Sequence, residues 1–114
     1  MNNKNKDIEI KFNLLRLINK NPEYSQREIA LHLGLSLGKI NYLLKELTKK
    51  GLIKIDNFSK NKNKFGYIYL LTPKGIVEKT SLAINFMRRK LNEYDELKKE
   101  LDNDKKSKKY TAKK

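Results

Sequence analysis

The sequence contains no cysteine, one histidine, two prolines and five glycines. Without cysteine, the chain can form neither disulfides nor thiolate metal sites. His32 has no carboxylate cluster beside it, so we expect no metal ion and no other cofactor. No apolar run approaches the roughly 18 residues of a membrane-spanning helix, and residues 1–10 lack the apolar centre of a signal peptide. We therefore expect a cytoplasmic protein with no membrane partner.

Groups that catalyse reactions are also scarce. The sequence has no histidine–carboxylate constellation, no glycine-rich phosphate loop and no thiol nucleophile. At 114 residues, the chain fits one small domain with an appendage and is short for a substrate cleft. The composition therefore predicts that the protein is not an enzyme.

Positive charge is present in excess. The 27 lysines and arginines against 13 acidic residues give a net charge of +14 and a pI near 9.9. Such a chain attracts polyanions, nucleic acid first and anionic membranes second, although an AT-rich genome would also produce many lysines without selection for binding. The charge is uneven: residues 1–90 hold 19 basic and 7 acidic side chains, residues 91–104 hold 2 and 6, and residues 105–114 hold six lysines.

Two helices are predicted in the first third of the chain. Residues 7–20 carry apolar side chains at helical spacing, at Ile8, Phe12, Leu15 and Ile18. We expect residues 1–6, which are polar, to fray. A short second helix begins after Ser25, because Ser25 and Glu28 match a capping box, and it ends at Gly34, which can adopt a positive φ.

A third helix follows the tight turn at Gly34. Ser36 is placed to cap it, and it extends to about Lys50 and ends at Gly51. Its predicted buried residues are Ile40, Leu43, Leu44 and Leu47. Two short helices joined by a glycine turn form a helix-turn-helix motif.

A β-hairpin is predicted after this motif. Residues 52–57 alternate at the period of a strand, and residues 66–71 are rich in strand formers. Tyr67 and Tyr69 lie on one face of the hairpin, where we expect them to pack rather than stack on bases. The fold class is therefore mainly α with a small β-hairpin: a winged helix-turn-helix over residues 1–72, followed by a long C-terminal helix.

That last helix is predicted over residues 73–104, with Thr72 as its cap and proline at its first position. Its apolar residues follow a heptad pattern, at Ile84, Met87, Leu91, Tyr94, Leu97 and Leu101, with a gap at Lys98. The pattern favours a homodimer through this helix over an intramolecular core. The lysine-rich residues 105–114 have no apolar pattern and are expected to be disordered.

The hydrophilic side of the helix-turn-helix motif suits DNA. In a winged helix, the second helix of the motif enters the major groove of duplex DNA. Lysine reaches phosphate or guanine, asparagine pairs with adenine, and tyrosine reaches phosphate or a thymine methyl. The candidate DNA contacts of this motif are Ser25, Gln26, Arg27, Ser36, Leu37, Gly38, Lys39, Asn41, Tyr42 and Lys45.

The hairpin tip supplies a second set of candidate contacts, at Lys60, Asn61, Lys62, Asn63 and Lys64. A basic loop at this place would cross phosphates or lie in the minor groove of A·T-rich DNA. Each set also has a simpler interpretation: a solvated helix face, a solvated turn, or, for Ser25, Gln26 and Arg27, plain capping.

Three stretches carry a family resemblance: SLGKINYLL (residues 36–44), NKNKFGYIYLLTPKG (61–75) and RRKLNEYDEL (88–97). With them, residues 25–101 resemble the MarR-family regulators associated with exopolysaccharide gene clusters. The resemblance implies a bacterial winged-helix transcription factor that is dimeric and acts near surface-polysaccharide biosynthesis genes. The sequence does not identify a small-molecule effector.

Two functions follow as hypotheses. The first is sequence-specific binding of double-stranded DNA by a homodimer that regulates transcription. The second is a winged-helix module that binds protein or RNA without recognising an operator, since a basic wing suits either nucleic acid.

Overall fold

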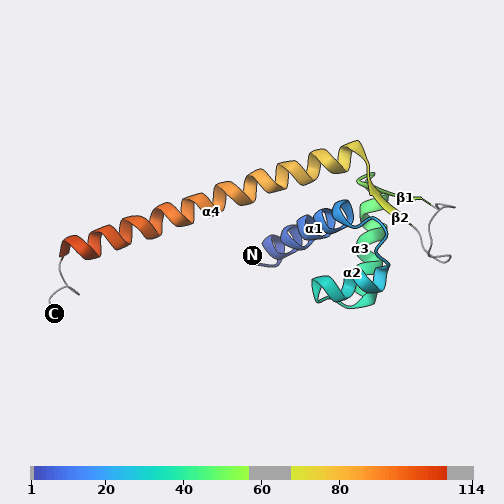
Figure 1. Cartoon of the computed structure of the whole chain (residues 1–114), viewed down its shortest axis with the longest axis horizontal. Helices are drawn as coiled ribbons and strands as arrows, with labels where there is room; N and C mark the ends of the chain where they lie inside the picture. Colours follow the sequence, from blue (N-terminus) through green and yellow to red (C-terminus); the bar gives the residue numbers. More distant parts are fainter. Residues whose placement is uncertain (1, 57–67, 108–114) are drawn as a thin grey trace. The chain divides into compact units, whose positions relative to one another are not determined.

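The computed structural model describes residues 2–56 and 68–107, and the side chains of residues 4–56 and 68–106 (Figure 1). Its elements are α1 (Asn2–Lys20), α2 (Gln26–Leu33), α3 (Leu37–Lys49), β1 (Ile53–Asp56), β2 (Ile68–Leu71) and α4 (Pro73–Ser107). The order of helices and hairpin is that of a winged helix-turn-helix with a long C-terminal helix. The predicted fold class is confirmed.

Helix α1 begins earlier than its apolar pattern indicates. Residues 2–6, expected to fray, are helical, and Ile8 is 37% exposed. The buried stripe starts only at Leu14 and continues through Leu15 and Ile18. The first two turns therefore extend the helix without contributing apolar burial, which is compatible with helix propagation from a packed segment.

The helix-turn-helix motif forms through the caps that the sequence predicts. The Ser25 hydroxyl accepts from the amide of Glu28, and the Glu28 carboxylate accepts from the amide of Ser25 at 2.7 Å, so the capping box is complete. Gly34 ends α2 in the left-handed region, at φ 69°. Ser36 caps α3 by accepting from the amide of Lys39 at 3.1 Å. Gly34 and Ser36 together set the tight turn between α2 and α3.

Strands β1 and β2 pair antiparallel, with Ile53 opposite Leu71 and Asp56 opposite Ile68. Tyr69 is 4% exposed, which confirms that it packs. Residues 57–67, and with them Tyr67 and the predicted contacts Lys60, Asn61, Lys62, Asn63 and Lys64, lie outside the described residues.

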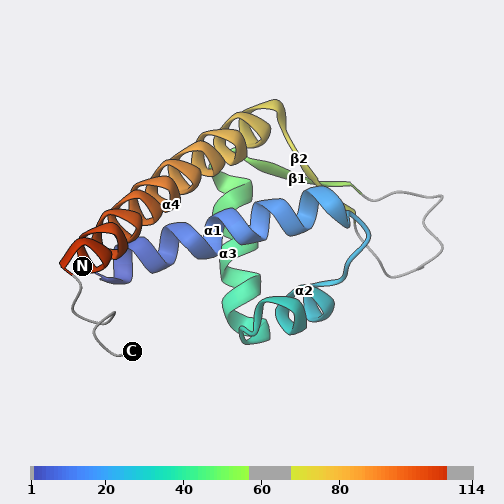
Figure 2. The same cartoon turned by 60° about the vertical axis from the view of Figure 1, so that its left-hand side comes forward.

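One apolar core joins these elements. Helix α1 contacts α2 and β2, and α3 contacts α2 and β1 (Figure 2). The described side chains that are fully buried in it are Leu14, Leu15, Ile18, Ile29, Ile40 and Ile53. Leu43 was predicted to be buried with Ile40, Leu44 and Leu47, but it is only half-buried. It lines a cavity between α1 and α3, where the two helices do not close on each other.

Helix α4 starts as predicted at Thr72-Pro73, where the Thr72 hydroxyl accepts from the amide of Gly75 at 3.0 Å. It extends to Ser107 as a continuous helix, so residues 105–107 are helical where a tail was expected (Figure 1). The chain divides into two compact units, residues 1–81 and 82–114. The proposed boundary after residue 72 remains a prediction. None of the helices described has the length and apolarity needed to cross a membrane.

Candidate nucleic-acid interface

Helix α3 has one buried side and one hydrophilic side. Ile40, Leu44 and Leu47 are at most 3% exposed. At about 100° per residue, Tyr42 and Lys45 lie roughly opposite these three residues. Tyr42 is 57% exposed, and Gly38 and Lys45 are exposed too. The amphipathic pattern thus leaves a continuous surface of α3 available to a partner, which we call the α3 outer face: Gly38, Tyr42, Lys45 and Lys49.

Lys49 belongs to this face, although it is not among the contacts predicted from the sequence. It is exposed and lies four residues after Lys45, one helical turn further along α3. Its spacing from Tyr42 and Lys45 was visible in the sequence. The contacts predicted on this helix from the sequence end one helical turn earlier, at Lys45.

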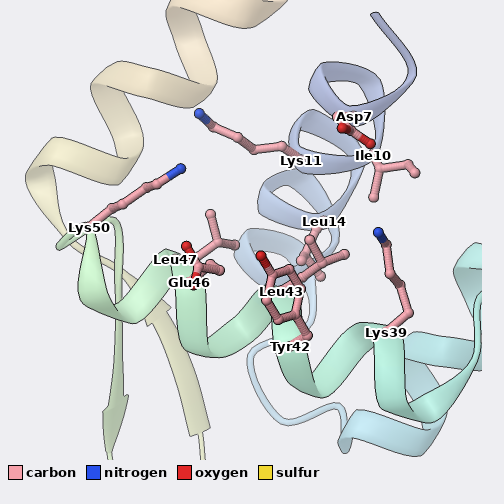
Figure 3. Close-up of a pocket in the computed structure, with 10 residues that line it drawn as sticks. All are labelled: Asp7, Ile10, Lys11, Leu14, Lys39, Tyr42, Leu43, Glu46, Leu47 and Lys50. Carbon is pink, nitrogen blue, oxygen red and sulfur yellow. The ribbon is translucent and has the colours of Figure 1, made fainter. Parts of the chain in front are cut away.

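Lys39 and Asn41 lie at opposite edges of the α3 outer face, about 160° apart around the helix at 100° per residue. Lys39 is on the α1 side, where it lines a cavity of about 290 Å³ with Leu43 of α3 and Ile10 of α1. Figure 3 shows Lys39 and Tyr42 directed from α3 toward α1 across this cavity. Lys39 is exposed, and its ammonium group can still reach outward because the lysine stem is long and flexible.

Asn41 is on the hairpin side and differs from its prediction. It was expected on an open hydrophilic face, but it is half-buried, and its Nδ2 donates to Gln26 Oε1 at 3.2 Å. Gln26 Nε2 in turn donates to the hydroxyl of Tyr69 at 3.0 Å. Two of the predicted contacts, Asn41 and Gln26, are therefore joined to each other and to β2.

The remaining predicted contacts lie near the start of α2 and α3. Arg27 is exposed in the first turn of α2, while Leu37 is 42% exposed in the first turn of α3. Ser25 and Ser36 both serve as helix caps through their hydroxyl oxygens. A serine hydroxyl that accepts from an amide still has its own hydrogen to donate, so capping is compatible with phosphate contact.

Among the described residues, metal-ligating side chains are not gathered into a second site. His32 Nε2 lies 3.2 Å from the hydroxyl of Tyr24. Among residues 2–56 and 68–107, no group of three or more His, Asp or Glu side chains is arranged to hold a metal ion. The hydrophilic surface of α3 is the feature of the described structure that best fits a macromolecular ligand.

Comparison with known proteins points to the same part of the chain, the helix-turn-helix that contains α3. A family described as winged helix-turn-helix DNA-binding matches residues 9–54, which hold α2, α3 and most of α1. No curated protein sequence matches the chain. Solved structures with this fold include regulators of the MarR family.

Three of these structures are informative. MepR, a transcription regulator of the Staphylococcus aureus multidrug efflux pump MepA, is 18% identical with a TM-score of 0.65, over 90% of this chain and 75% of MepR. The repressor CouR, bound to a 23-mer DNA duplex, is 24% identical with a TM-score of 0.64, over 89% of this chain and 70% of CouR. A mutant of Escherichia coli MarR, complexed with operator DNA, is 22% identical with a TM-score of 0.54, over 63% of this chain and 50% of MarR. At these identities the likeness shows a shared fold.

Proposed function

We propose that the protein is a transcription regulator that binds double-stranded DNA in a sequence-specific manner and acts as a homodimer. The observation that carries the proposal is the α3 outer face. It lies opposite the buried stripe of α3, is exposed, and carries Tyr42, Lys45 and Lys49 in the helix that a winged helix-turn-helix inserts into the major groove. The CouR and MarR structures, which share the fold, contain DNA.

Roles follow from the chemistry of each side chain. Asn41 reads a base, since an amide can pair with adenine through one donor and one acceptor. Arg27, Lys45 and Lys49 contact phosphates and set the position of the helix on the duplex. Lys60, Lys62 and Lys64 of the hairpin tip neutralise further phosphates. The net charge of +14 would speed the encounter with DNA.

The target genes are the finer part of the proposal. The motifs SLGKINYLL, NKNKFGYIYLLTPKG and RRKLNEYDEL resemble those of regulators associated with exopolysaccharide gene clusters, so we place the operator near bacterial surface-polysaccharide biosynthesis genes. Sequencing of the genomic fragments that the protein retains would test this. Enrichment of unrelated promoters would contradict the gene assignment and leave DNA binding intact.

The division of labour between base and phosphate contacts is testable by selecting bound sequences from random duplex DNA. We expect Asn41→Ala to relax the preference at one base position by about 5- to 150-fold, the discrimination of one good bidentate contact. Lys62→Ala should reduce the affinity for all DNA sequences by the same factor. With six phosphates neutralised, log K against log salt concentration should fall with a slope of about −5, and Lys62→Ala should reduce that slope by about one.

Lys99→Ala is the matched control, because it removes the same charge from an exposed position of α4. It should leave affinity and preference unchanged. Uniform loss of affinity in both Asn41→Ala and Lys62→Ala would contradict the assigned roles. If the wild-type chain binds structured RNA but no duplex DNA at about 150 mM salt, the alternative of an RNA-binding module replaces the proposal.

A further inference from the structure

A chain of three side chains connects helix α3 to strand β2. Asn41 Nδ2 donates to Gln26 Oε1 at 3.2 Å, and Gln26 Nε2 donates to the Tyr69 hydroxyl at 3.0 Å. The three residues come from α3, α2 and β2, and they are 15 and 43 positions apart in the sequence. Both hydrogen bonds are partly buried, so water competes with them less than it would at the surface.

Tyr69 is the fixed end of this chain. Its side chain is 4% exposed, and its backbone amide donates to the carbonyl of Pro22 at 3.2 Å, just before α2. Packing restricts the ring, and the amide contact ties this part of β2 to the segment that leads into α2. The phenol oxygen is therefore a rigid reference point, and a hydrogen bond to it can position a neighbour accurately.

Gln26 transmits this constraint because its amide has a donor at one end and an acceptor at the other. With Nε2 donated to Tyr69, Oε1 faces Asn41 and can only accept. In this arrangement Asn41 directs its Nδ2 toward Gln26. The Oδ1 of Asn41 then remains available as an acceptor, and the second hydrogen on Nδ2 remains available as a donor.

One acceptor and one donor on a planar amide match the adenine edge in the major groove, where N6 donates and N7 accepts. Without an anchor, the asparagine amide could rotate about its last torsion angle and present its donor and acceptor in the reverse order. Preorganisation of the amide reduces the cost of ordering it on binding. Holding the amide in one orientation therefore strengthens the preference for one base.

We infer that Gln26 and Tyr69 are positioning residues that determine base specificity through Asn41, with an A·T pair as the recognised base pair. This inference rests on the proposed function. Tyr69 lies in the buried part of the hairpin and contacts no base itself. Gln26, predicted as a direct DNA contact, acts here by orienting its neighbour.

The test is Tyr69→Phe in the full chain, measured by selection from random duplex DNA and by affinity for the selected site and its single-base variants. We expect the preference for A·T at the position read by Asn41 to fall about two- to tenfold, the loss of one anchoring hydrogen bond. The slope of log K against log salt should not change, because no phosphate contact is removed.

Tyr24→Phe is the matched control: it also removes a phenol hydroxyl beside the helix-turn-helix motif, but that hydroxyl contacts His32 and not the chain to Asn41. It should keep the full base preference. A second variant, Gln26→Glu, covers the case in which Tyr69→Phe does not fold. A carboxylate accepts from both Asn41 and Tyr69, so the variant should bind all sites more weakly while retaining the A·T preference, and Gln26→Ala should lose that preference.

The outcomes separate the inference from the function on which it rests. If Asn41→Ala relaxes one base position and both Tyr69→Phe and Gln26→Ala keep it, the positioning role is wrong and DNA binding stands. If Asn41→Ala relaxes no position of a specific site, the inference is likewise overturned. If the wild-type chain selects no duplex sequence at all, the proposed function fails and the inference fails with it.

Discussion

At the residue scale, two glycines differ in how much space surrounds them. Gly38 lies in the first turn of α3, and Gly75 lies in the first turn of α4. A Cβ at Gly38 would meet nothing within 4 Å. A Cβ at Gly75 would overlap the backbone carbonyl of Leu52, just before β1. Gly75 is therefore required for the close approach of α4 to the hairpin. The need for glycine at position 75 could not be predicted from the sequence, because close packing against backbone leaves no periodic signal.

This contrast predicts opposite effects on folding. We expect Gly75→Ala to reduce the free energy of unfolding by about 1–3 kcal/mol, as overpacking against immobile backbone does. Gly38→Ala should raise it by about 0.4–1 kcal/mol, because alanine restricts the unfolded chain and fits the open site. Urea denaturation at one protein concentration measures both. Equal stability of the two variants would show that the backbone of Leu52 moves aside.

At the scale of a single element, the start of helix α3 depends on the residue that caps its N-terminus. Ser36 has extended backbone angles and its hydroxyl accepts from the amide of Lys39, one of the amides that a helix N-terminus leaves without a partner. Because Ser36 and Gly34 together define the turn from α2, the start of the α3 outer face depends on this contact. The contact was predictable, since caps act within four residues.

Ser36→Ala should therefore lower the free energy of unfolding by about 1 kcal/mol. Ser81→Ala is the matched control, because Ser81 is exposed within α4, where alanine is the better helix former. That variant should be no less stable than the wild type. Thermal and urea unfolding followed by circular dichroism would detect the difference. A Ser36→Ala protein as stable as the Ser81→Ala protein would mean that α3 is held by packing alone.

At the scale of the whole molecule, α4 carries an exposed apolar face whose residues are not part of the buried core of the winged helix. Six residues form it, and each is about half exposed or more: Ile84, Met87, Leu91, Tyr94, Leu97 and Leu101. A heptad seam of this kind needs a partner in water. The proposed homodimer would cover this face with a second copy of the chain, and a two-fold dimer reads half-sites about 34 Å apart.

Leu91→Lys should convert the proposed dimer to a monomer and reduce affinity for a two-half-site duplex at least tenfold. A lysine in the seam places two like charges in an apolar interface. Asn92→Lys is the control, since it adds the same charge at a neighbouring exposed position off the seam. Sedimentation velocity reports the mass of each. A wild-type chain that sediments as a monomer while binding DNA tightly would refute pairing through this helix.

The local features of the fold could be predicted because they depend on neighbours in the sequence. Capping at Ser25 and Ser36, the positive φ of Gly34 and the start of α4 at Pro73 each involve residues within four positions. The buried stripe of α3 followed from its leucine spacing. Leu43 was misjudged, since its burial depends on how closely α1 approaches and not on its place in the helix.

The candidate site was predicted less completely. That α3 turns a hydrophilic side outward follows from periodicity alone, which is a property of the sequence. That Asn41 is half-buried, oriented by Gln26 and anchored through Tyr69 was decided only by the tertiary structure, which brings together residues 15 and 43 positions apart. The physical reason is the distance along the sequence over which each effect acts. Helix periodicity and caps depend on residues a few positions apart. The orientation of a side chain depends on the residues that pack beside it in the folded chain, and these can be far apart in the sequence.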